Sequence, residues 1–63
     1  MSDYVIKINS EVVTQTTNQR AALLAFSAAF EDLMKVQGTQ KTLRLEDHLE
    51  GEFILVTYEQ GKL

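Results

Sequence analysis

Residues 18–37 read NQRAALLAFSAAFEDLMKVQ, and this segment has the clearest structural pattern in the chain. Its apolar residues recur every three or four positions, so on a helix they would fall within about 160° of arc. The predicted buried stripe consists of Ala22, Leu23, Phe26, Ala29, Phe30, Leu33, Met34 and Val36. The spacing therefore predicts one amphipathic helix.

Both ends of the predicted helix carry residues that suit a helix terminus. At the start, Thr16 and Gln19 have the spacing of a capping box, and Thr17 or Asn18 would also serve as the N-cap. At the other end, Gly38 suits the left-handed conformation that often follows a helix. The two boundaries agree with the apolar pattern between them.

The segment before the helix alternates between apolar and polar residues. In residues 3–9, Tyr4, Ile6 and Ile8 point to one side, which predicts a strand with one buried face. Residues 11–16 are rich in β-branched side chains and would return as the second strand of a hairpin. The alternative is a loop that leads into the helix.

The segment after the helix alternates in the same way. Leu43 and Leu45 share one side of a predicted strand over residues 40–46, and residues 52–58 form the last strand. The expected fold class is α+β, with a small antiparallel sheet of three to four strands and one helix packed on one face, in the order β(β)αββ. Residues 1–63 are expected to form a single domain.

The last predicted strand is apolar on both sides. Alternate positions place Phe53, Leu55 and Thr57 on one side and Ile54, Val56 and Tyr58 on the other. One helix covers one face only, whereas a strand that is apolar on both sides is typical of a sheet covered twice. We expect a second copy or another protein there, in contact with Val5, Phe53 and Leu55. The alternatives are a slipped register that exchanges the two sides, or ordinary exposed apolar residues.

The helix offers one more candidate contact residue, Leu24, which lies opposite the buried stripe. It stands among small residues, Ala21, Ala25 and Ala28, which would allow close approach of another element. The alternative is that alanine, the best helix former, simply occupies an exposed face.

Composition limits how so small a chain can be stabilised. It has 63 residues, no cysteine and a net charge of −3, so disulfides and thiolate metal sites are excluded. At this size the gain from burial and the cost of ordering the chain nearly cancel, and a partner chain is the usual remaining support. We therefore expect a homodimer. No apolar run is long enough to span a membrane, and we expect a cytoplasmic protein without membrane contact.

One segment concentrates negative charge. It contains Glu46, Asp47, Glu50 and Glu52 around the single histidine, His48. The spacing does not match a calcium-binding loop, so we expect a solvated acidic patch, with no metal site and no cofactor. Such a patch would complement a basic surface on a partner.

The remaining sequence features bear on function. No motif for nucleophilic catalysis or phosphate binding is present, so we do not expect an enzyme. The six basic residues are scattered, which argues against binding of duplex nucleic acid. The sequence indicates a small homodimeric protein-interaction module that binds another protein and modulates or inhibits it. In size and composition alone the chain is similar to the small modulators of phages and mobile elements.

A second hypothesis belongs to a different class. An acidic small protein can imitate the phosphate backbone of nucleic acid, or it can bind single strands directly, and in either way it would interfere with nucleic-acid-binding machinery.

Overall fold

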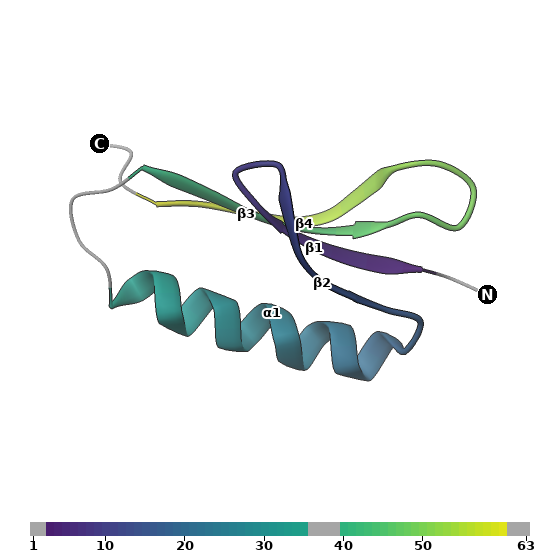
Figure 1. Ribbon diagram of the computed structural model, residues 1–63, viewed down its shortest axis with the longest axis horizontal. Coiled ribbons are helices and arrows are strands. Elements are labelled where there is room, and N and C mark those ends of the chain that lie inside the picture. The colour runs from purple at the N-terminus through teal and green to yellow at the C-terminus, as the bar shows by residue number, and fades with distance from the viewer. Residues whose placement is uncertain (1–2, 36–39, 61–63) are drawn as a thin grey trace.

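Four strands and one helix make up the part of the chain that the computed structural model describes, residues 3–35 and 40–60. Along the chain they are β1 (Tyr4–Ile8), β2 (Glu11–Thr16), α1 (Gln19–Met34), β3 (Lys41–Asp47) and β4 (Phe53–Gln60). The sheet has the order β2-β1-β3-β4, every neighbouring pair is antiparallel, and α1 lies along one face (Figure 1). The expected α+β class is confirmed, with four strands in the order ββαββ.

A two-residue turn makes the first hairpin and confirms the strand expected over residues 11–16. Asn9 and Ser10 both have positive φ angles, 53° and 71°, as the favoured two-residue hairpin turns require. The turn is also held by β3, because the Asn9 N–H donates to the Thr42 carbonyl at 2.9 Å and the Asn9 Oδ1 accepts from the Thr42 N–H at 3.0 Å. Local turn chemistry and sheet pairing therefore support the same hairpin.

The helix starts at Gln19, with Asn18 as its N-cap. The Asn18 Oδ1 accepts a hydrogen bond from the Ala21 N–H at 3.0 Å. Thr16 holds the N-cap residue itself, because the Thr16 Oγ1 accepts a hydrogen bond from the Asn18 N–H at 3.2 Å. Of the three expected capping arrangements, the structure therefore has the one that uses Asn18. At the other end, Lys35 is the C-cap, and Gly38 lies outside the described residues.

We expect Asn18→Ala to lower the free energy of unfolding by about 1 kcal/mol, because the Ala21 N–H loses its acceptor at the helix start. Thermal or urea unfolding followed by circular dichroism measures the change. Thr17→Ala, one residue earlier and exposed, is the matched control and should change stability by less than about 0.5 kcal/mol. Equal losses in the two variants would contradict the assignment of the cap.

The core lies between the helix and the centre of the sheet. Its buried side chains are Ile6, Ala22, Leu33, Leu43 and Leu45. Tyr4, Ile8, Phe26, Ala29, Phe30 and Tyr58 pack against them. The predicted inward faces of β1 and β3 are thereby confirmed. Two members of the predicted helix stripe are not buried, because Leu23 and Met34 are about half exposed, and a third, Val36, lies outside the described residues.

A bulge in β4 changes which of its residues share a side. Leu45 pairs with Val56 and Glu46 pairs with Ile54, so Leu55 is an extra residue with no partner in the register. Phe53 therefore shares the helix side with Val56 and Tyr58, and Ile54 shares the opposite side with Thr57. The simple alternation expected from the sequence, with Phe53, Leu55 and Thr57 on one side, is wrong, because an inserted residue reverses the sides beyond it.

Candidate functional site

The longest run of consecutive exposed apolar side chains in the described part of the chain lies on β4, at one edge of the sheet. Phe53, Ile54, Leu55 and Val56 are 59%, 55%, 50% and 40% exposed, and we call these four residues the β4 patch. The helix packs mainly on β1, β2 and β3 and less on β4, and the turn between β3 and β4 lies well away from it (Figure 1). Phe53 and Val56, on the helix side, are therefore exposed because α1 does not reach this end of the β3–β4 hairpin, whereas Ile54 lies on the face without a helix.

Part of the helix extends the same apolar surface. Phe30 of α1 meets Tyr58 of β4 edge to face, with ring centroids 4.7 Å apart. Leu23 and Met34 lie seven residues before and four residues after Phe30, hence on the same side of the helix. These two exposed residues, which we call the helix flank, therefore face the side of the molecule on which β4 runs.

The structure separates the contact residues that the sequence predicted. Phe53 and Leu55 belong to the β4 patch, and Leu24 is exposed on α1, outside the helix flank. Val5 differs from expectation, because its side chain is only 3% exposed. It lies in a central strand between Gln15 and Glu46 on the face without a helix. The prediction that Val5 belongs to an outer contact surface is therefore wrong.

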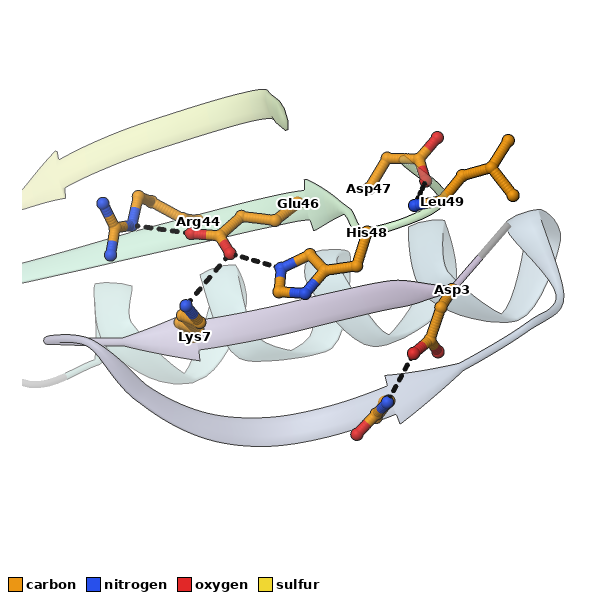
Figure 2. A network of polar contacts seen from close by, with 8 residues as sticks. Asp3, Lys7, Arg44, Glu46, Asp47, His48 and Leu49 are labelled. Atoms are coloured by element: carbon orange, nitrogen blue, oxygen red, sulfur yellow. Dashed lines mark hydrogen bonds and ion pairs between the residues drawn. The ribbon is translucent and has the colours of Figure 1, made fainter. Parts of the chain in front are cut away.

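The face without a helix has charged groups at its centre. The Glu46 carboxylate is buried, with 3% of its side chain exposed, and Lys7, Arg44 and His48 converge on it (Figure 2). Its Oε1 lies 3.1 Å from Lys7 Nζ and 2.7 Å from His48 Nε2, and its Oε2 lies 3.4 Å from Arg44 Nε. Glu46 is thus an internal counter-ion, and it does not belong to an accessible acidic patch as the sequence had suggested.

These contacts favour the charged form of Glu46. The hydrogen bond with His48 lowers the pKa of this carboxyl, burial opposes that effect, and Lys7 and Arg44 lower the pKa further. Lys7 and Arg44 are directly opposite each other in the β1–β3 register, where two cations would repel. Glu46 compensates both charges. Sequence reasoning missed Lys7 and Arg44 because only the pairing of two non-consecutive strands brings them together.

The other three predicted acidic residues stay at the β3–β4 turn. Asp47 shapes the turn, since its Oδ1 accepts from the Leu49 N–H at 3.0 Å, and the His48 N–H donates to the Asp3 carbonyl at 2.8 Å. Glu50 and Glu52 are exposed. We call Asp47, Glu50 and Glu52 the acidic turn. It lies directly beside the start of the β4 patch, so an apolar and a negative surface adjoin.

A groove on the opposite side of the helix was not predicted. It has a volume of about 460 Å³ and runs between β2 and the C-terminal half of α1. Its walls include Val13, Thr14, Ala25, Ala28, Ala29 and Asp32. Ala25 and Ala28, two of the three alanines that the sequence offered as a contact strip, line this groove and are too small to fill the space beside β2.

The chain matches no family model, no curated protein and no solved structure. Among residues 3–35 and 40–60, no three His, Asp or Glu side chains lie close enough together to hold a metal ion. No helix in the same part of the chain is long and apolar enough to cross a membrane.

Proposed function

We propose that this chain is a small non-catalytic interaction module that pairs with a second copy of itself and acts by binding another protein. The β4 patch carries the proposal, because its four consecutive apolar residues are all 40% exposed or more. Single exposed apolar side chains are ordinary on a protein surface, whereas contiguous apolar patches larger than a few hundred Å² mark interaction sites.

The small size of the core supports self-association. Within residues 3–35 and 40–60, five apolar side chains form the buried cluster between helix and sheet. A 63-residue domain with no disulfide has little stability to spare. Covering the β4 patch with a second copy would add apolar burial next to this core, where Tyr58 already contacts Phe30.

The surface left for a different protein is the acidic turn. Asp47, Glu50 and Glu52 remain accessible next to the β4 patch, and they would favour a partner with a basic surface. Leu24 on the outer side of α1 is a second accessible contact residue. The alternative of nucleic-acid mimicry has less support, because the buried Glu46 is compensated by Lys7 and Arg44 and does not add to the surface charge.

Self-association is tested by light scattering and by thermal melting over a hundredfold range of protein concentration. We expect a mass of twice the chain's 7.1 kDa and a melting temperature that rises with concentration, because a dimer is stabilised by mass action. Ile54→Asp places a charge in the β4 patch and should weaken dimerisation at least tenfold.

Val12→Asp is the matched control for this substitution. Val12 is also β-branched and is 52% exposed, close to the 55% of Ile54, but it lies on β2 at the other edge of the sheet. It should leave the dimer intact. A wild-type chain that stays monomeric over the whole concentration range, or equal effects of the two substitutions, would contradict the proposal.

A further inference from the structure

We propose that the groove between β2 and α1 binds an extended segment of another protein, which adds a strand to the free edge of β2 and carries an apolar residue flanked by basic ones. The inference rests on the part of the proposed function that concerns another protein, and it names a further surface, the chemistry of the partner and the way it binds. Three observations support it: the free edge of β2, the groove beside this edge, and the charges around the groove.

β2 is the end strand of the sheet opposite β4. Within residues 3–35 and 40–60 it pairs on one side only, with β1. The outer edge of such a strand presents backbone N–H and C=O groups that can pair with another extended chain. β2 contains neither lysine nor proline, the residues that commonly protect an edge from such pairing, and four of its six residues are exposed. The backbone of β2 is therefore accessible to an added strand.

The groove lies next to this edge, on the helix side of the sheet. Its volume of about 460 Å³ is within the range of ligand-binding clefts. Apolar side chains from both elements line it: Val13 of β2, and Ala25, Ala28 and Ala29 of α1. Side chains alternate between the two faces of a sheet, so every second side chain of a strand added to β2 points to the helix side and lies over this groove. Backbone pairing and apolar burial are therefore available to the same segment, as in other peptides that extend a sheet.

A bulge in β2 shapes the groove. Val13 is an extra residue between the pairs Ile6–Thr14 and Lys7–Val12. Because of this insertion, two consecutive side chains, those of Val13 and Thr14, line the groove. A bulge disrupts the regular strand edge locally. The pairing with β1 is regular beyond it, in the second half of β2, and the added strand pairs with this half.

The charges around the groove favour a basic partner. Asp32 of α1 lines the groove, and Glu11 lies on the same side of the sheet because it pairs with Ile8, another groove residue. Lys41 also lines the groove, so two carboxylates against one ammonium group leave a charge of −1. Among the described residues, none of these three charged side chains has an ion-pair partner. Because the whole chain is also negative, basic residues beside the apolar one would be attracted to this edge.

A synthetic peptide with the sequence TKTITKT, acetylated at its N-terminus and amidated at its C-terminus, tests the inference. Its central isoleucine and both lysines lie on one side of an extended chain, so a lysine flanks the isoleucine in either strand direction. The peptide is titrated into the isotope-labelled full-length chain, and the amide chemical shifts are followed by NMR. We expect shifts that saturate below about 1 mM peptide and are largest in β2 and the facing side of α1, together with slower amide exchange in β2.

Matched controls separate the contributions of charge and groove. The peptide TETITET should bind about tenfold more weakly, because its glutamates meet Asp32 and Glu11 with like charge. Ala28→Leu fills the groove and should weaken binding of TKTITKT by about tenfold, whereas Ala21→Leu, at an exposed helix position that does not line the groove, should change it less than about twofold. Asp32→Asn removes a charge from an exposed position and should weaken binding by about threefold.

The outcomes distinguish this inference from the proposed self-association. Shifts that do not saturate below about 1 mM, shifts that are largest in β4, or equal affinity for TKTITKT and TETITET would overturn the inference. The groove and the β4 patch lie at opposite edges of the sheet, so light scattering of the same samples reports self-association separately. A dimer that does not bind the peptide overturns the inference alone, and a monomer that binds it overturns the self-association alone. Circular dichroism of each variant confirms that it is folded.

Discussion

Leu43→Ala is expected to lower the free energy of unfolding by about 3 kcal/mol, within the range measured for leucine truncations in protein cores. Leu43 has no exposed surface, and it lies in the central strand β3 between Ile8 and Tyr58. Truncation removes apolar contacts and leaves a cavity that the neighbouring strands cannot close. A 63-residue domain has a total stability of roughly 3 to 9 kcal/mol, so a large part would be lost.

The measurement is chemical or thermal unfolding at a fixed protein concentration, because self-association would otherwise add to the change. The melting temperature should fall by roughly 12 to 24 °C. Leu49→Ala removes the same atoms from a half-exposed position in the β3–β4 turn and should change stability by less than about 0.5 kcal/mol. Similar losses in both variants would show that Leu43 is not in the core.

Replacing the buried carboxylate should have the second largest effect. We expect Glu46→Gln to lower stability by about 2 kcal/mol at pH 7, because the side chain keeps its shape but loses its charge. Lys7 and Arg44 then face each other across β1 and β3 with no negative charge to compensate them. Glu50→Gln, an exposed carboxylate on the neighbouring turn, should change stability by less than about 0.5 kcal/mol.

The effect of Glu46→Gln should depend on pH in a defined direction. The pKa of Glu46 is lowered in the folded state, by the hydrogen bond with His48 and by Lys7 and Arg44. In the carboxyl titration range the unfolded chain therefore binds more protons, and stability falls as the pH falls. The contribution is complete above the unfolded-state pKa and is lost as the pH drops through the lowered folded-state pKa.

The wild type and Glu46→Gln should accordingly differ most near neutral pH and converge in acid. Urea unfolding at several pH values between 7 and 3 measures the difference, and Glu50→Gln should show no comparable convergence. A difference that stays constant over this range would mean that the charge of Glu46 does not stabilise the fold.

Much of the fold could be predicted because local patterns and packing agree. The alternation of Tyr4, Ile6 and Ile8 and of Leu43 and Leu45 identified the inward sides of two strands correctly. The helix was predicted from spacing alone, and its cap was among the three arrangements considered. Leu23 and Met34 were assigned to the core wrongly, because helical periodicity gives the direction of the apolar side but not the width of the sheet surface that covers it.

The candidate site was predictable only in part. Phe53 and Leu55 were predicted to be contact residues because their strand is apolar on both sides; both are exposed, and their role in a contact stays a prediction. Val5 and Glu46 were assigned to the surface but are buried, because their strands occupy the centre of the sheet. Strand order depends on which strands pair, and the alternation within one strand contains no information about its neighbours.

The amino-acid pattern was sufficient to predict the class of fold, the helix, the inward faces of two strands and a last strand that is apolar on both sides, and it left three arrangements open for the helix cap. The tertiary structure alone decided that this strand lies at an edge, that a bulge at Leu55 reverses its sides, and that Glu46 is held among Lys7, Arg44 and His48. The two sets of features differ in the sequence separation of the interactions that produce them. Hydrophobic periodicity and helix capping depend on residues close together in the sequence. Strand order, register and charge compensation depend on contacts between residues far apart in the sequence.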